Sequence, residues 1–288
     1  KISMMALRRG ITCRYLASGA EIPADLMYAL PKEKRRSLVR PKRIFVVRHG
    51  ESLGNISPEV YINVPDWRIS LTEEGKEQAK ATGSKISHII GEDPVFFYTS
   101  PYRRTKETLQ SMVTEFEQSD IVGVREEPRL TEQQFGNFQN LDEIQICKVE
   151  RSSYGRFYYR FPQGESGFDV YTRVSTFLPD LYRDAANAEL FGEGQTARDL
   201  NVVIVSHGLT LRLLLMRWFQ YTISDFEQSH NPPNAAFVVM ERREDQAHTG
   251  REWYELTEES LKLLNYSPPE HKGSLWKLMS ELSHDHGS

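Results

Sequence analysis

Two apolar runs that each end in a histidine and a glycine constrain this chain more than any other feature. Residues 44–47 are Ile-Phe-Val-Val and lead into Arg48-His49-Gly50, whereas residues 202–205 are Val-Val-Ile-Val and lead into Ser206-His207-Gly208. Four consecutive apolar, mostly β-favouring residues predict a buried strand, and the glycine ends it. Because ligands in open α/β sheets bind at the carboxyl ends of the strands, we expect both histidines at one edge of one sheet.

The remainder of the pattern alternates strands with helices. Further strands are predicted over residues 95–98, 121–124, 236–240 and 253–256. A helix is predicted from Thr72 to Gly91, because the threonine can cap it and two acidic residues follow in the first turn. Such alternation predicts an α/β fold with a mainly parallel central sheet between two helical layers, a three-layer α/β/α sandwich.

Four blocks of the chain together resemble the signature of a known family. In chain order they are Arg48-His49-Gly50, Ser-Pro-Tyr-Arg-Arg-Thr-Lys-Glu-Thr over residues 100–108, Leu-Thr-Glu-Gln-Gln-Phe-Gly over residues 130–136, and Ser206-His207-Gly208. This order resembles the histidine phosphatase superfamily, and within it the phosphoglycerate-mutase-like branch. The resemblance implies the same sandwich and a phosphoryl-transfer enzyme.

The residue types in these blocks suit transfer of a phosphoryl group. A planar guanidinium donates two parallel hydrogen bonds to phosphate oxygens, and this chemistry depends mainly on positioning and on stabilising charge. The resemblance implies that Arg48 and Arg104 bind the phosphoryl group, with His207 as a third donor, and that His49 is the nucleophile. For these roles we expect a neutral His49, held at one ring nitrogen by the carbonyl of Gly50, and a protonated His207.

Two further site residues follow from the resemblance. The local sequence alone makes Glu132 one solvated acid among several, but its place in the third block implies a general acid that protonates the leaving oxygen. Asn55 stands where the family often places a phosphate contact; the alternative is a simple turn former. The residues show no metal-binding pattern, so no metal is expected.

We therefore expect a phosphatase that hydrolyses a small phosphomonoester through a phosphohistidine at His49. The alternative is a 2,3-bisphosphoglycerate-dependent phosphoglycerate mutase, and only this alternative would require a cofactor, 2,3-bisphosphoglycerate. The segments 53–55 and 62–67 depart from the mutase pattern, which favours the phosphatase. A pseudoenzyme that only binds phosphorylated ligands is disfavoured, because all the expected phosphate-binding residues and the acid are present.

Charge and composition predict three regions. Residues 1–43 contain eleven Lys and Arg against three acidic residues, whereas the whole chain has a net charge of −4. We expect a basic N-terminal arm over residues 1–41, a catalytic domain over 42–260 and a polar C-terminal tail over 261–288. Within the domain, an aromatic and basic insert over about 141–167 is expected to cover the active site. The arm is interpreted as a flexible tail, with a transit peptide as the alternative.

The expected partner is a small phosphorylated substrate. No apolar stretch approaches the roughly 20 residues of a membrane span, so no membrane partner is expected. The chain beyond the basic arm is acidic, which argues against a nucleic-acid partner. The two cysteines, Cys13 and Cys147, predict a reducing compartment and hence a cytoplasmic location, with organellar targeting as the alternative. A homo-oligomer is left open.

Overall fold

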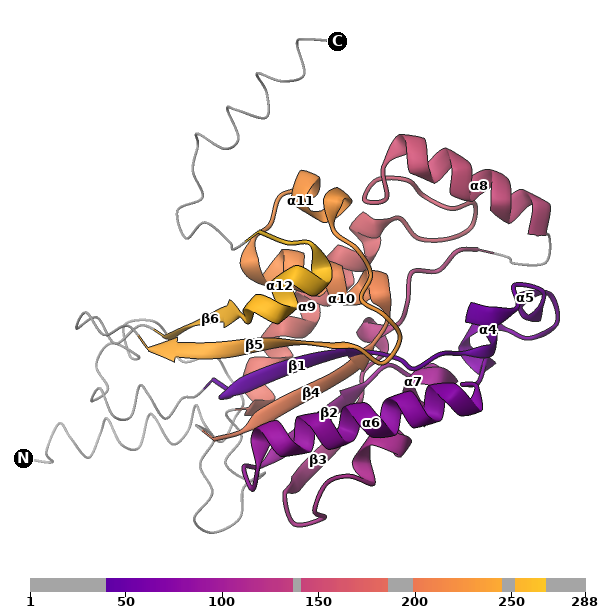
Figure 1. The fold of residues 1–288 in the computed structure, drawn as a ribbon. Helices are drawn as coiled ribbons and strands as arrows, with labels where there is room; N and C mark the ends of the chain where they lie inside the picture. The colour runs from indigo at the N-terminus through magenta and orange to yellow at the C-terminus, as the bar shows by residue number, and fades with distance from the viewer. Residues whose placement is uncertain (1–39, 137–140, 186–198, 245–251, 268–288) are drawn as a thin grey trace, which may run out of the picture.

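The computed structural model describes residues 40–136, 141–185, 199–244 and 252–267. Almost all of the expected N-terminal arm, and the expected C-terminal tail beyond residue 267, therefore lie outside the described residues. The described part of the chain forms one sheet flanked by helices (Figure 1).

The sheet has six strands in the order β3-β2-β4-β1-β5-β6. The pairs β1–β4, β2–β4 and β2–β3 are parallel, whereas β5 pairs antiparallel with both β1 and β6. The mainly parallel sheet expected from the sequence is thus confirmed. The strands are β1 (Arg43–Arg48), β2 (Val95–Thr99), β3 (Ile121–Glu126), β4 (Asn201–Ser206), β5 (Phe237–Glu244) and β6 (Glu252–Leu256).

Helices cover both faces of the sheet and confirm the three-layer arrangement. In Figure 1, α6 and α7 lie on one face, while α9, α10 and α12 lie on the other. The long helices are α6 (Glu73–Ile90), α7 (Arg103–Val113), α8 (Leu141–Tyr154), α9 (Gly167–Ala185) and α10 (Gly208–Phe219). The short ones are α4 (Leu53–Ile56), α5 (Val60–Asn63), η1 (Asp66–Arg68), η2 (Pro128–Leu130), α11 (Ile223–Gln228) and α12 (Glu258–Leu264).

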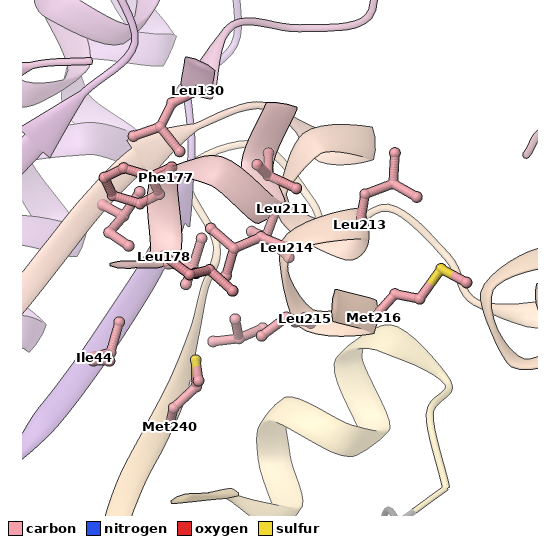
Figure 2. Packing of buried hydrophobic residues seen from close by; sticks show 14 of the residues in the cluster. Ile44, Leu130, Phe177, Leu178, Leu211, Leu213, Leu214, Leu215, Met216 and Met240 are labelled. Carbon is pink, nitrogen blue, oxygen red and sulfur yellow. The ribbon is translucent and has the colours of Figure 1, made fainter. Parts of the chain in front are cut away.

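The side chains of β1 show why the sheet needs helices on both sides. Successive residues of a strand point to opposite faces. Ile44 and Val46 belong to the buried cluster beneath α9 and α10, part of which Figure 2 shows, whereas Phe45 and Val47 belong to the cluster beneath α6 and α7. All four are fully buried. A strand that is apolar on both faces is stable only between two layers.

Local signals fix the ends of α6 as the sequence predicts. The hydroxyl of Thr72 accepts a hydrogen bond from the backbone N–H of Gly75 at 2.9 Å, and Glu73 and Glu74 occupy the first turn. Gly91 ends the helix with a φ of 61°, a left-handed value that glycine adopts without strain. The predicted helix is confirmed at both ends.

The folded body extends further in both directions than the boundaries at residues 42 and 260. The Arg40 carbonyl accepts a hydrogen bond from Arg242 of β5, and the Pro41 carbonyl accepts one from the Tyr254 hydroxyl of β6. At the other end, Leu264 and Tyr266 are buried in the cluster beneath α9 and α10. Leu264 and Tyr266 therefore pack into the core, although Lys262, Asn265 and Ser267 are exposed.

The insert combines an exposed helix with a buried anchor. Helix α8 carries exposed apolar side chains, including Ile146 and Val149, and lies at the same end of the molecule as α4 and α5 (Figure 1). After the helix, Phe157 and Phe161 are buried, and Phe157 joins the cluster beneath α9 and α10. The insert is therefore fixed to the body through its second half.

Candidate active site

The register of two neighbouring strands brings the histidines together. β1 and β4 are adjacent and parallel, and Arg48 pairs with Ser206 at their carboxyl ends. The next residue in each strand is a histidine, so His49 and His207 leave the sheet side by side. Their ring centroids are 5.3 Å apart. The convergence expected from the sequence is present, and it follows directly from which strands are neighbours.

The hydrogen bond of His49 determines its tautomer. Its Nδ1 lies 2.7 Å from the carbonyl oxygen of Gly50. Because a carbonyl oxygen only accepts, Nδ1 must carry the proton, and the lone pair is left on Nε2. Burial, followed by the positive charge of Arg104, holds the pKa of His49 well below its ordinary value. The ring is therefore neutral at pH 7, as a nitrogen nucleophile requires.

The loop that carries His49 is fixed by its close packing. A Cβ atom added at Gly50 would lie 2.3 Å from the carbonyl oxygen of Gly75, so only glycine fits there. The Gly50 N–H donates to Thr108 Oγ1 at 3.0 Å, and the Thr108 hydroxyl donates to the Arg104 carbonyl at 2.7 Å. Thr108 therefore joins the His49 loop to the helix that presents Arg104.

Residues after α11 hold the same loop from the other side. The Asn234 side-chain amide donates to the carbonyls of His49 and Gly50 at 3.3 and 3.2 Å. The Pro232 carbonyl accepts a hydrogen bond from Arg48 Nη1 at 2.6 Å. Arg48 Nε is buried and has no hydrogen-bond partner within the described residues, so a donor remains for a ligand.

Arg104 is almost fully buried, with 4% of its surface exposed. Its Nη1 donates to both the backbone carbonyl and the carboxylate of Asp66, at 2.8 and 2.7 Å. Its guanidinium carbon lies 4.8 Å from the centroid of the Tyr102 ring. The same ring packs edge to face against His207, with centroids 5.0 Å apart. Arg104 therefore lies beside the two histidines.

His207 is fully buried beside cationic groups. Its Nε2 lies 2.9 Å from Ser100 Oγ, and Nδ1 has no hydrogen-bond partner among the described residues. Burial, then the positive charge of Arg104, lowers the pKa of His207 well below its ordinary value. These surroundings favour the neutral ring, and a protonated His207 that faces a phosphate stays a prediction.

Glu132 is joined to α10 by a hydroxyl. Thr210 Oγ1 lies 2.7 Å from the Thr131 carbonyl and 3.2 Å from Glu132 Oε1. Oε1 accepts this hydrogen bond, and it also accepts one from the backbone N–H of Gln133 at 3.1 Å. These two contacts hold the carboxyl group beside α10.

An ion pair braces the backbone of this acid. The Arg173 guanidinium pairs with both carboxylate oxygens of Glu165, at 3.0 and 3.1 Å, and donates to the carbonyls of Arg129 and Glu132. Glu165 also accepts from the backbone N–H of Gln134 at 3.0 Å. The segment that carries the candidate acid is thus held at both ends.

Asn55 is the third residue of α4, and its side chain bonds back to the N-cap residue Ser52. Its side-chain oxygen accepts from the Ser52 N–H at 3.0 Å and from the Asn234 amide at 3.1 Å, which fixes the start of α4. A phosphate contact by Asn55 stays a prediction. The sequence offered no signal for Asp66, Asn234 or Thr108, because each acts on a residue far away along the chain.

The described residues show neither a cluster of metal ligands nor a membrane-spanning helix. They contain no group of three or more His, Cys, Asp or Glu side chains that could hold a metal ion. In the same part of the chain, none of the helices is long and apolar enough to cross a membrane.

Comparisons with known proteins agree with this site. A family model described as "Histidine phosphatase superfamily (branch 1)" matches residues 44–253. The chain is 46% identical over 210 residues to phosphoglycerate mutase-like protein AT74H of Arabidopsis thaliana, with 70% of this chain and 74% of that protein covered. It is 29% identical over 292 residues to broad-range acid phosphatase DET1 of Saccharomyces cerevisiae, with 70% and 86% covered.

A solved structure has the same fold. The mycobacterial glucosyl-3-phosphoglycerate phosphatase in complex with VO3 matches with a TM-score of 0.55 over 75% of this chain and 98% of that chain. The sequences are 22% identical, so this likeness concerns the fold alone.

Proposed function

We propose that this chain, which belongs to the histidine phosphatase superfamily (branch 1), hydrolyses small phosphomonoesters through a phosphohistidine at His49. One observation carries the proposal. His49 is neutral, its Nδ1–H donates to the Gly50 carbonyl, and its Nε2 keeps a lone pair in a site that also holds Arg104 and His207. A fixed neutral imidazole beside buried arginines suits attack on phosphorus.

In the first step, His49 Nε2 forms a bond to phosphorus and the ester P–O bond breaks. Glu132 gives its proton to the leaving oxygen, so the alcohol departs neutral. Arg48 and Arg104 stabilise the negative charge on the other phosphoryl oxygens. The negative charge of the phosphoryl group favours the protonated form of His207, against the burial that lowers its pKa.

In the second step, a water oxygen attacks phosphorus and the N–P bond breaks. Glu132, now a carboxylate, takes the proton from the water, which returns His49 to its neutral state and releases inorganic phosphate. Both steps use protein side chains and water alone, so we propose that hydrolysis needs no cofactor.

The name of the yeast relative supports hydrolysis. Arg151 offers a test of the mutase alternative. The yeast relative is named an acid phosphatase, whereas the Arabidopsis relative is named phosphoglycerate mutase-like. In the insert, Arg151 is largely buried between the rings of Phe135 and Phe161, its guanidinium carbon 5.8 and 5.5 Å from their centroids. Burial lowers the pKa of Arg151 and the charge of Glu132 raises it, and the Arg151 Nε is buried without a hydrogen-bond partner among the described residues.

The phosphohistidine is tested by trapping it. The enzyme is incubated with a ³²P-labelled phosphomonoester and quenched rapidly, and the protein-bound label is tested for stability in acid and in base. We expect a label that is labile in acid and stable in base, and its absence from His49→Ala. A label retained by that variant would assign the nucleophile elsewhere.

The choice between phosphatase and mutase is tested with one substrate. The enzyme receives 3-phosphoglycerate with and without 2,3-bisphosphoglycerate, and 2-phosphoglycerate and free phosphate are followed together. We expect release of phosphate, with isomerisation weak or absent. Fast isomerisation that depends on the bisphosphate, with little phosphate released, would establish the mutase.

A further inference from the structure

Arg104 is a buried cation. Its main hydrogen-bond partner lies outside the four sequence blocks that resemble the family. A buried charge is costly unless it is paired and hydrogen-bonded. Here the partner is Asp66, whose backbone carbonyl and carboxylate both accept from Nη1 of Arg104. The two residues are 38 positions apart in the chain, and the short helix η1 brings Asp66 to the start of α7.

The contact determines which edge of the guanidinium is left for a ligand. Nη1 carries two hydrogens, and its two acceptors on Asp66 use both. The guanidinium is planar, and the Tyr102 ring lies beneath it at 4.8 Å. Because the guanidinium is planar, holding Nη1 and one face also fixes the orientation of the remaining edge. Nε and Nη2 form that edge. That edge is the one that binds two phosphate oxygens in parallel.

The backbone before Asp66 is stiff. Pro65 precedes it with a φ of −53°, and the proline ring restricts this angle. Asp66 then opens η1, and its side chain is only 19% exposed. A carboxylate on a restrained backbone can hold Arg104 in one orientation before any phosphate arrives, so the enzyme does not have to order a long flexible side chain during binding.

We propose that Asp66 is a positioning residue that holds Arg104 by hydrogen bonds in the orientation that binds the phosphoryl group. This inference rests on the proposed function only in assigning Arg104 to the phosphoryl group. The positioning role of Asp66 gives a reason for the segment 62–67, which departs from the mutase pattern, to lie against the site. In the opposite role, the Asp66 carboxylate competes with phosphate for Arg104. Removing this carboxylate should weaken phosphate binding in the first role and strengthen it in the second.

Three single variants separate the hydrogen bond from the charge. Asp66→Ala removes the side-chain acceptor, Asp66→Asn keeps an oxygen acceptor without the charge, and Glu59→Ala removes an exposed carboxylate from the same region as a matched control. The measurements are kcat and KM for p-nitrophenyl phosphate, and the dissociation constant of inorganic phosphate by calorimetry. Circular dichroism and thermal unfolding check that each variant is folded.

We expect Asp66→Ala to lower kcat/KM and to weaken phosphate binding by about 10- to 100-fold, the effect of losing a charged hydrogen-bond partner. Asp66→Asn should recover most of this loss, and Glu59→Ala should match the wild type. Tighter phosphate binding by Asp66→Ala would show competition and overturn the proposal. Equal losses for the alanine and asparagine variants would also overturn it.

A double-mutant cycle tests whether Asp66 acts through Arg104. If it does, Asp66→Ala should weaken phosphate binding less than about threefold in an Arg104→Ala background, because the residue it positions is gone. The same loss in both backgrounds would overturn the proposal. Phosphate binding is independent of turnover, so a wild type that binds phosphate with this coupling but hydrolyses no ester would contradict the proposed function alone.

Discussion

Two regions of the proposed site differ in how deeply they are buried. We call the loop 48–52 with Arg104 and His207 the floor, and the insert over residues 141–167 the roof. In the floor, His49, Arg104 and His207 are each 5% exposed or less, and neighbouring elements hold them. In the roof, α8 exposes Ile146 and Val149, each 58% exposed, and Tyr154 at 70%.

This difference separates the reaction from the choice of substrate. Donors that stabilise a transition state must be fixed in advance, and the floor satisfies this through contacts from β1, β4, α7 and the segment after α11. The roof contacts the body through Phe157, which packs on Phe226, and through Arg156, which pairs with Glu227. Changes in the floor should therefore affect all phosphate esters, whereas changes in the roof should affect some esters more than others.

Glu132 is held by contacts from α9 and α10, and its replacement should have the largest effect. Glu132→Gln cannot supply a proton, so alkyl phosphates, whose leaving oxygen needs one, should react about 10²-fold more slowly. Aryl phosphates with good leaving groups should lose far less. The two substrate classes are compared by kcat for wild type and variant, and equal losses for both would remove Glu132 from the role of acid.

Arg151 tests the roof. Its Nε is buried without a hydrogen-bond partner among the described residues, so Arg151→Ala should lower kcat/KM for 3-phosphoglycerate by about tenfold and change p-nitrophenyl phosphate little, because only the former carries a carboxylate on its leaving group. Lys148→Ala, an exposed residue of the same helix, is the matched control. If both substrates suffered equally, Arg151 would belong to the floor and the comparison would fail.

The pKa of His207 predicts how the stability of the folded protein depends on pH. Its pKa in the folded, ligand-free protein lies below the ordinary value of 6.5, so the unfolded chain binds more protons as the pH falls through 6.5. The free energy of unfolding of the wild type should decrease below that pH, with one such histidine contributing at most about 1.4 kcal/mol per pH unit.

Replacing His207 with Asn should make this decrease smaller. Unfolding by urea between pH 7 and pH 5, in buffers free of phosphate, measures the slope. His88→Asn, which removes an exposed histidine of α6, is the control. An unchanged slope for the His207 variant would mean that the ring is protonated in the folded protein.

Removing residues 1–39 should have the smallest effect. All the candidate site residues lie beyond residue 47, and Arg40 and Pro41, which bond to β5 and β6, are kept. We expect kcat for p-nitrophenyl phosphate to stay within about twofold of the wild type, with an unchanged melting temperature. A large loss of kcat in a folded protein would show that the basic segment contributes to the site.

Local sequence patterns predicted the strands of the sheet and placed both histidines at strand ends. Runs of four apolar residues followed by glycine fix where β1 and β4 end, and this information is local. The cap at Thr72 and the end of α6 at Gly91 are equally local. The family resemblance added Arg104 and Glu132 to the candidate site. The structure places Arg104 and His207 against the same Tyr102 ring and joins Glu132 to Thr210 of α10.

Only the tertiary structure decided what holds these residues and which charge they carry. Asp66 meets Arg104 across 38 positions and Asn234 meets the His49 carbonyl across 185, and no local pattern encodes such pairs. The neutral state of His207 likewise depends on burial and on the field of Arg104. Propensity and periodicity act over a few residues, whereas hydrogen-bond partners and pKa values depend on whichever groups the completed fold brings within a few ångströms.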